Sequence, residues 1–123
     1  MIEIKFKAWN YNEKTMHHIV TGIEWLEQGV FVLADGVRGQ FGPVILLQYT
    51  GLHDRNGKEI YEGDICKMGW EGHEIIAPMI WNSEKAQFGL DATVDFESPE
   101  HIKDVPTRPE VIGNIYENPE LLK

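Results

Sequence analysis

The sequence predicts an all-β fold: a small bent sheet or SH3-like barrel of short antiparallel strands, with little helix. Apolar and polar residues alternate with a period of two, and no apolar pattern of helical period persists along the chain. Gly, Asn and Pro separate about eight or nine short stretches of this kind, as turns do in small β proteins. Because the edges of so small a sheet need cover, a closed or strongly bent sheet is favoured over a flat one.

The N-terminal part of the chain is expected to form strands and a hairpin. In residues 2–9 the charged side chains of Glu3, Lys5 and Lys7 alternate with apolar ones, which is typical of a half-buried strand. Residues 23–28 lie between two glycines and fit either a strand or one helical turn. The strands expected here cover residues 2–9, 15–20 and 30–34, with turns at 10–14 and 35–39.

The rest of the chain is expected to continue as short strands and tight turns. Asn56-Gly57 is the preferred pair for a two-residue type I′ hairpin turn, in which both central residues need a positive φ. Ser98 followed by Pro99 suits the start of a single helical turn, and Asn118 suits the start of another. The strands expected here cover residues 44–50, 60–61, 65–68, 73–81, 88–90 and 110–117.

The length predicts one domain, residues 1–123, with a single core. Within it, residues 1–42 are expected to supply the N-terminal strands and a hairpin, and residues 43–123 a barrel-like β core. The single Cys66 cannot form an internal disulfide, and the N-terminus alternates in polarity where a signal peptide would be apolar. No stretch is apolar enough for a membrane span. We therefore expect a cytoplasmic protein that does not associate with membranes.

The charge balance bears on the partners that the protein can have. The chain carries 20 acidic and 11 basic side chains, for a net charge of −9. The acids are spread along the sequence, which predicts an acidic surface and not an acidic tail. Such a surface repels phosphate backbones and anionic lipid, so nonspecific binding to nucleic acid or membranes is disfavoured.

The densest group of polar residues and glycines lies in residues 49–66. Asp54 begins a segment that resembles a calcium-binding loop, but the position that should carry the closing Glu is Ile65. A hairpin turn is therefore favoured over a calcium site. The residues expected to have turn or structural roles are Asn56, Gly57, Gly63 and Asp64.

Glu62 and Asp64 form the strongest candidate for a chemical site. On a strand, residues two apart share a face, so the two carboxylates could hold a metal ion or act as an acid and base pair. Gly63 separates them, however, and a turn in which the carboxylates accept hydrogen bonds from nearby backbone N–H groups is favoured.

The other candidate groups do not form a catalytic or metal-binding pattern. The histidines lack the spacing of metal ligands, and His17 and His18 would point to opposite faces of a strand. Cys66 lacks a neighbouring base and is expected to be a packed thiol. Four tryptophans could stack on nucleic-acid bases, but core packing is favoured for Trp9, Trp25, Trp70 and Trp81. We expect no catalytic residue, no cofactor and no metal ion.

Three segments resemble the YopX family, which comprises small proteins of bacteriophages and prophages. They are IEIKFKAW at 2–9, LQYTGLHDRNGKEIYEGDI at 47–65 and EVIGNIYENPELL at 110–122, in the order and with the spacing of the family. The resemblance implies a mostly-β phage protein that self-associates, has no established activity and offers no catalytic motif to transfer. Cys66 replaces the Val that commonly follows Gly-Asp-Ile in the family, a small apolar change that packing tolerates.

The leading functional hypothesis is a non-enzymatic protein-interaction module that associates with itself and binds a host or phage protein in the bacterial cytoplasm. The C-terminal segment is the expected contact, because a terminus that ends in two leucines has few places within its own chain to bury them. The candidate self-association residues are Ile115, Tyr116, Leu121 and Leu122.

Two alternatives from other functional classes stay open. A nucleic-acid-binding small β-barrel would need a basic patch, and the cations available for it are Lys5, Lys7, Arg38, Arg55, Lys58 and Lys67. A metal-dependent hydrolase would use Glu62, Asp64 and a histidine brought within hydrogen-bond reach of one another.

At physiological salt we expect no tight binding to arbitrary duplex DNA. A net charge of −9 leaves few cations that could displace counterions from the phosphates. Fluorescence anisotropy of a labelled duplex measures this, with a basic DNA-binding protein as the positive control. A Kd of about 1 μM or tighter would contradict the prediction.

Overall fold

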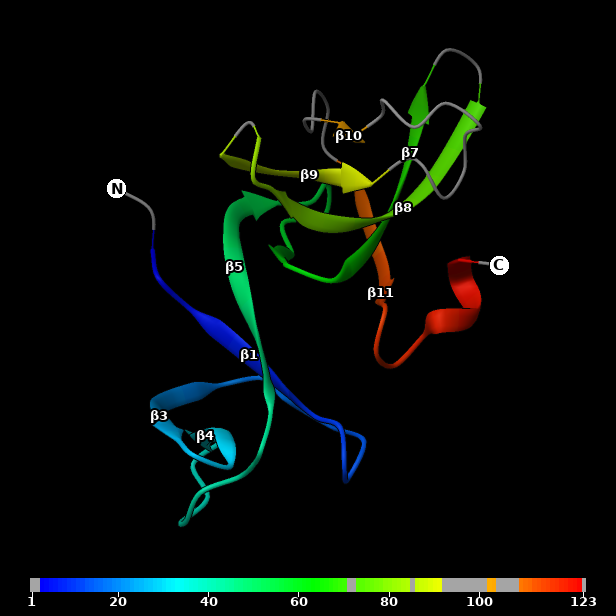
Figure 1. The fold of residues 1–123 in the computed structure, drawn as a ribbon. Coiled ribbons are helices and arrows are strands. Elements are labelled where there is room, and N and C mark those ends of the chain that lie inside the picture. Colours follow the sequence, from blue (N-terminus) through cyan, green and yellow to red (C-terminus); the bar gives the residue numbers. More distant parts are fainter. Residues whose placement is uncertain (1–2, 71–72, 85, 92–101, 104–108, 123) are drawn as a thin grey trace. The chain divides into compact units, whose positions relative to one another are not determined.

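A computed structural model shows an all-β fold of curled antiparallel sheets (Figure 1), which confirms the predicted fold class. The residues that the structure describes are 3–70, 73–84, 86–91, 102–103 and 109–122. The chain divides into two compact units, residues 1–49 and 50–123, and strand β5 (Ile45–His53) contributes to both. The expectation that residues 1–123 form one domain stays a prediction.

The first unit contains a small sheet around strand β1 (Phe6–Asn10). β1 pairs in antiparallel fashion with β2 (Thr15–His17) on one side and with the first half of β5 on the other. The side chain of Asn10 accepts hydrogen bonds from two backbone N–H groups of the following turn, the turn chemistry expected of Asn. The strand predicted over residues 2–9 is observed as Phe6–Asn10, and the carbonyl of Lys5 just before it accepts a hydrogen bond from the N–H of Tyr49 at 2.9 Å.

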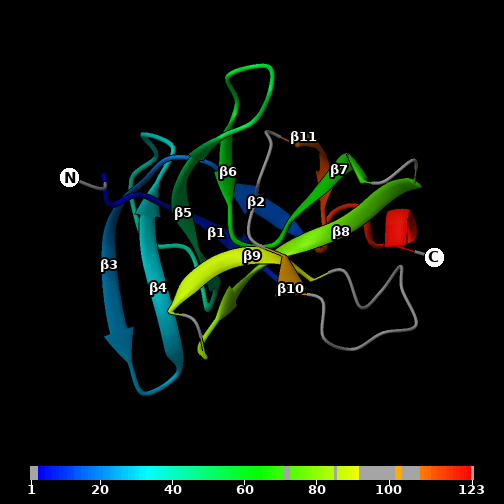
Figure 2. The same cartoon turned by 90° about the horizontal axis from the view of Figure 1, so that it is seen from above.

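The second sheet of this unit is a hairpin of β3 (Val20–Leu26) and β4 (Gly29–Ala34), which lie side by side in Figure 2. Residues 23–28, which fitted a strand or a helical turn, are the end of β3 and the tip of this hairpin. One face of the hairpin packs into the core of the first unit. The buried residues of this core are Ala8, Val32, Ala34 and Val44, with Val20, Ile23, Val30, Phe41 and Leu46 packed against them.

The second edge of β4 is covered by the chain that follows it. Val32 and Phe41 exchange two backbone hydrogen bonds of 2.8 Å each. The N–H of Val44 donates to the carbonyl oxygen of Val30 at 2.9 Å. β4 is thus paired on both sides, and β3 is the edge strand of this hairpin.

The second unit is built on a five-stranded antiparallel sheet in the order β10-β9-β8-β7-β11. Its strands are β7 (Asp64–Trp70), β8 (His73–Asn82), β9 (Gln87–Asp91), β10 (Ile102–Lys103) and β11 (Glu110–Asn114). β8 pairs with β7 up to Pro78 and with β9 from Met79 onward, and Figure 1 shows it curving without a break. Because proline has no N–H to donate, this is a position where a strand can change partner. The buried core consists of Ile60, Cys66, Met68, Ile75, Ala77, Met79 and Leu90.

The chain ends in a short 3-10 helix, η2 (Pro119–Leu122), after the turn that follows β11. The side-chain oxygen of Asn118 accepts from the N–H of Asn114 at 3.2 Å, and the N–H of Asn118 donates to the carbonyl of Asn114 at 2.9 Å. The terminal turn expected at Asn118 is therefore present. The turn expected at Ser98 lies outside the described residues.

The connection from β5 to β6 (Glu59–Tyr61) corrects one sequence prediction. Gly57 has a positive φ of 84°, but Asn56 does not have one, so the two-residue type I′ turn was wrong. The N–H of Asp54 donates to the carbonyl of Lys58 at 2.7 Å, and the N–H of Gly57 donates to the carbonyl of Asp54 at 3.0 Å. This is the three-residue hairpin loop, in which a left-handed glycine completes the turn.

Gly57→Val is expected to lower the free energy of unfolding by about 1–2 kcal/mol, because a β-branched side chain is strained at this φ. A Cβ at Gly57 would meet no heavy atom within 4 Å, so the loss reflects backbone strain and not a clash. Gly57→Asn is the matched control and should lose less, since Asn tolerates the left-handed region. Chemical denaturation measures both variants. Equal stability of Gly57→Val and the unsubstituted protein would contradict the role given to this glycine.

Candidate functional site

The densest polar stretch of the sequence serves the fold. Asp54 is 1% exposed, and its carboxylate accepts three backbone hydrogen bonds. Oδ1 accepts from the N–H groups of Asn56 at 2.8 Å and Lys58 at 2.9 Å. Oδ2 accepts from the N–H of Val111, in the distant strand β11, at 3.1 Å. One carboxylate thus fixes the hairpin loop and fastens it to the last strand of the chain.

These hydrogen bonds set the protonation state of Asp54. Burial by itself would raise its pKa, because it disfavours the charged form. The N–H groups of Val111, Lys58 and Asn56, together with the positive charge of Lys58, outweigh burial and hold the pKa below its usual value. The ionised carboxylate is therefore the form that stabilises the fold.

Glu62, Gly63 and Asp64 form the turn between β6 and β7. Asp64 is buried, and its Oδ2 accepts from the N–H of Tyr61 at 2.8 Å. Gly63 has a φ of 88° and donates its N–H to the carbonyl of Met79. Its own carbonyl accepts a hydrogen bond from the N–H of Ile115. Within the described part of the chain, no three His, Cys, Asp or Glu side chains are grouped to hold a metal ion.

A buried His–Asp pair in the first unit was not anticipated. His17 is 4% exposed, whereas its neighbour His18, which follows the end of β2, is exposed. Nδ1 of His17 lies 2.9 Å from Oδ2 of Asp35, and Oδ1 of Asp35 accepts from the N–H of Ile19. Burial would raise the pKa of Asp35, but the hydrogen bonds from His17 and Ile19 lower it below its usual value. The pair ties β2 to the turn that follows β4.

The second ring nitrogen of His17 has no hydrogen-bond partner among the described residues. Its ring packs against that of Phe41, with the centroids 4.3 Å apart. Because Phe41 is also the residue that pairs with β4, the imidazole is held between the two sheets of the first unit. We assign the His17–Asp35 pair to the architecture of this unit.

Cys66 is the packed thiol that the sequence predicted. It is fully buried in the core of the second unit. Burial, with the nearby negative charges of Asp64 and Asp54, raises the pKa of its thiol to about 12. A thiol of this kind is not a nucleophile near neutral pH.

The tryptophans correct a second prediction, because they are not uniformly core residues. Trp9 is buried, but Trp25 is 69% exposed and Trp81 is 48% exposed. Trp81 packs edge-on against Phe88, with 5.0 Å between the ring centroids. The side chain of Trp70 lies outside the described part of the chain. Exposed indoles are the kind of side chain that protein interfaces use.

The cations that a nucleic-acid interface would need are partly engaged with acids. Nζ of Lys5 lies 3.3 Å from Glu3, and Nζ of Lys67 lies 3.7 Å from Glu110. Each of these pairs is partly exposed and adds little to stability, but it reduces the local positive charge. No helix in the described residues is long and apolar enough to cross a bilayer.

The candidate self-association residues at the C-terminus are half-buried within their own unit. An added Cβ at Gly63 would lie 3.2 Å from the ring of Tyr116 and 3.7 Å from Ile115. One at Gly113 would lie 2.9 Å from Leu121. These side chains, like that of Leu122, are therefore partly buried by their own chain, and part of their apolar surface stays exposed.

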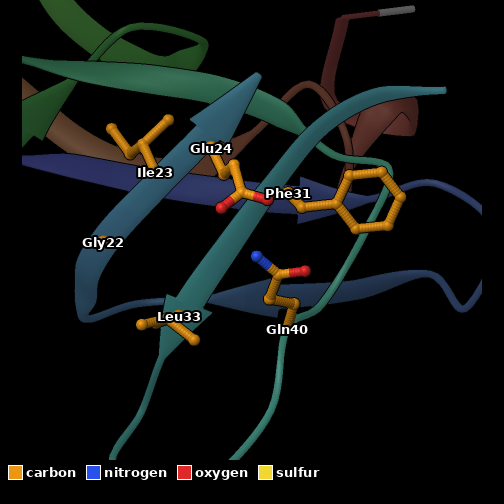
Figure 3. Close-up of a pocket in the computed structure, with 6 residues that line it drawn as sticks. All are labelled: Gly22, Ile23, Glu24, Phe31, Leu33 and Gln40. Carbon is orange, nitrogen blue, oxygen red and sulfur yellow. The ribbon is translucent and has the colours of Figure 1, made fainter. Parts of the chain in front are cut away.

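The outer face of the β3–β4 hairpin carries a shallow pocket of about 130 Å³ (Figure 3). It is lined by Gly22, Ile23, Glu24, Phe31, Leu33 and Gln40. The side chains of Glu24 and Gln40 point toward each other across it, with the ring of Phe31 to one side. The pocket therefore joins apolar walls to one carboxylate and one amide.

The pocket exists because Gly22 has no side chain. Gly22 lies opposite Leu33, and Glu24 lies opposite Phe31, so these four residues share one face of the ribbon. A Cβ at Gly22 would approach the Leu33 side chain to 3.2 Å and begin to fill the space. A glycine in an alternating strand marks a site where another group approaches closely, which is the one signal in the sequence that could have indicated this pocket.

The fold and these sites define a small β protein in which the carboxylates of Asp35, Asp54 and Asp64 accept hydrogen bonds from the backbone and Cys66 is buried. The family model described as YopX protein matches residues 5–123, so the chain belongs to the YopX family. The match covers nearly the whole chain and bears out the family resemblance of the three segments.

Among solved structures, the fold is shared by the following protein. It is described as the crystal structure of protein EF1440 from Enterococcus faecalis, and it aligns with a TM-score of 0.65 and 24% identity. The alignment covers 100% of each chain. At this level of identity the likeness establishes the fold alone. No curated protein shows significant similarity to the sequence.

Asp54→Asn is expected to lower the free energy of unfolding by about 3 kcal/mol, because the side chain at this buried position loses its charge and its amide group cannot accept at both positions, which leaves one partly buried N–H unpaired. The folded pKa of Asp54 lies below the unfolded value, so its stabilisation is complete above about pH 4 and is lost as the pH falls through the folded pKa. The stability gap between the two proteins should therefore narrow on acidification.

Urea denaturation between neutral and acidic pH measures this gap. Glu27→Gln, at an exposed carboxylate of the hairpin tip, is the control and should leave stability almost unchanged. A gap that stays constant as the pH falls would contradict the role given to the Asp54 charge.

Proposed function

We propose that this chain is a non-enzymatic protein-interaction module that associates with itself and binds another protein. The observation that supports this most is the distribution of exposed apolar side chains. Of the ten large apolar side chains that are exposed among the described residues, eight lie in the first unit. They are Ile4, Tyr11, Ile19, Trp25, Leu26, Leu33, Val37 and Ile45.

Three of these side chains lie on one hairpin. Trp25, Leu26 and Leu33 are 69%, 40% and 44% exposed, respectively, and all belong to β3 or β4. Single exposed apolar residues are ordinary, but a group of them with an aromatic member is typical of a surface that binds another protein. Leu26 and Leu33 lie on the pocket face of the hairpin, whereas Trp25 lies on the opposite face, so the exposed apolar side chains flank the outer edge of β3. We assign this hairpin to the partner protein.

For self-association we keep the C-terminal residues Ile115, Tyr116, Leu121 and Leu122. Their half-buried side chains leave apolar area that a second copy can cover, while acidic groups stay at the rim. Burial raises the pKa of Tyr116, and the negative charge of Glu62 raises it further, so its hydroxyl is neutral and suited to an interface. A phage or prophage setting and the bacterial cytoplasm belong to the same proposal and rest on the family.

Light scattering behind a sizing column tests self-association. At tens of micromolar we expect a mass above the 14.1 kDa of one chain. Leu122→Ser should lower this mass, because it places a hydroxyl in the proposed contact. Leu52→Ser is the matched control, since Leu52 is 38% exposed in the same unit but outside the contact, and it should leave the mass unchanged.

A mass near 14.1 kDa for the unsubstituted protein would refute self-association. An oligomer that Leu122→Ser leaves unchanged would refute the C-terminal contact and retain the oligomer.

A further inference from the structure

We propose that the outer edge of β3 binds an extended strand of a partner protein, with a basic side chain opposite Glu24 and an aromatic side chain over Gly22. This inference rests on the proposed role as a protein-interaction module and adds the site and the chemistry of the partner. It depends on three features of the hairpin: the direction of its backbone groups, the pocket beside them, and the charge of Glu24.

The backbone of β3 presents unpaired donors and acceptors along its outer edge. The backbone groups of Val30 and Val32 point away from β3, since they bond to Val44 and Phe41. Their partners in the register, Trp25 and Ile23, therefore form non-hydrogen-bonded pairs with β4. It follows that the N–H and C=O groups of Ile23 and Trp25 point outward. No backbone hydrogen bond to this edge is present within the described residues.

β3 is the longest edge strand that the structure describes. It has seven residues, whereas the edge strands β2, β6 and β10 have two or three. The edge of β11 is largely used, because the N–H of Val111 donates to Asp54 and that of Asn114 to Asn118. A bulge at the start of β3 interrupts its pairing, but Gly22–Leu26 are regular. A regular edge of this kind is a template for strand addition.

The pocket lies where side chains of an added strand would reach. The backbone N–H and C=O groups of Gly22 and Glu24 point toward β4. Relative to a strand added on the outer edge, these two residues would therefore occupy non-hydrogen-bonded positions, where the side chains of paired residues lie closest together. A large ring opposite Gly22 would cover the space that this glycine leaves and contact Leu33. A Lys or Arg opposite Glu24 would meet its carboxylate and lay its aliphatic part near Phe31.

An antiparallel partner strand must therefore carry the basic residue first and the aromatic residue two positions later. The net charge of −9 also favours a basic partner, because it steers the approach of positive segments.

A second copy of β3 fits this edge less well. The regular segment Gly22–Leu26 is centred on Glu24, so antiparallel self-pairing would set Glu24 opposite the same residue of the other copy. Two carboxylates in a non-hydrogen-bonded pair, with Cα atoms about 4.5 Å apart, repel each other. A basic residue in that place converts the repulsion into attraction.

The experiment is an NMR titration of the full chain, labelled with ¹⁵N, with capped heptapeptides. The first probe is Ser-Thr-Lys-Val-Tyr-Thr-Ser, which places Lys opposite Glu24 and Tyr over Gly22. We expect saturable shifts centred on the amides of residues 22–26. Replacing Lys with Glu in the peptide should weaken binding about five-fold, and replacing Tyr with Gly should weaken it about three-fold.

Charge reversal tests the Glu24 contact from both sides. Glu24→Lys should reverse the preference, so that this variant binds the Glu peptide more tightly than the Lys peptide. A preference that Glu24→Lys leaves unchanged would overturn the assignment of the basic side chain.

Backbone pairing is tested without disturbing side chains. Trp25→Pro removes an outward N–H and should abolish binding, while Trp25→Thr loses the same indole but keeps the N–H and should bind. If Trp25→Pro is misfolded, N-methylation of the peptide's Val, which pairs with Ile23, blocks the same edge on the native protein and should also abolish binding. Binding that survives N-methylation overturns strand addition.

The oligomeric state separates this inference from self-association. A monomeric protein that binds the Lys peptide supports the inference and refutes self-association. An oligomer that dissociates in Trp25→Pro but not in Trp25→Thr, and that does not bind the Lys peptide, shows a second copy on the β3 edge and overturns the inference. Absence of shifts at residues 22–26 at millimolar peptide overturns it as well.

Discussion

The buried carboxylate of Asp54 is the interaction on which the second unit depends. It gathers N–H groups from its own hairpin loop and from β11, two segments that are far apart in the sequence. Charge-assisted hydrogen bonds of this kind are strong, and these partly buried hydrogen bonds would all be lost if the carboxylate were absent. The same bonds select the three-residue loop, so Gly57 rather than Asn56 takes the left-handed conformation.

The hydrogen bonds between buried or partly buried carboxylates and the backbone also bear on function. Asp54, Asp64 and Asp35 each accept backbone hydrogen bonds, and Cys66 is buried with a raised pKa. Groups engaged in this way hold the fold together and are not poised to donate or accept protons from a substrate. This arrangement supports an interaction role, in which the surface of the protein rather than a reactive centre meets the partner.

The edge strands of the two units differ in whether their outward-facing backbone groups have hydrogen-bond partners, and this difference singles out the β3–β4 hairpin. In the second unit the N–H groups of β11 that face away from β7 are taken by the side chains of Asp54 and Asn118. In the first unit, residues 41–44 cover β4, while β3 keeps outward-facing backbone groups next to a pocket that Gly22 creates. An uncovered edge favours pairing with another chain, and Glu24 at its centre selects the charge of the strand that can pair there.

The sequence by itself determined the class of the fold and the place of most strands and turns. Alternation sets which side chains share a face, and glycine, Asn and Pro set where the backbone can turn, so these features follow from local sterics. It did not determine the form of residues 23–28, the length of the loop at Gly57, or the exposure of Trp25 and Trp81. Each of these features depends on contacts with other parts of the chain. Pairing with β4 makes residues 23–26 a strand, and hydrogen bonds to the Asp54 carboxylate fix the length of the loop. Which indoles are buried depends on the segments that pack against them. The pocket and the free edge beside it are likewise products of tertiary pairing, because local preferences fix the direction of a side chain but not what lies across from it.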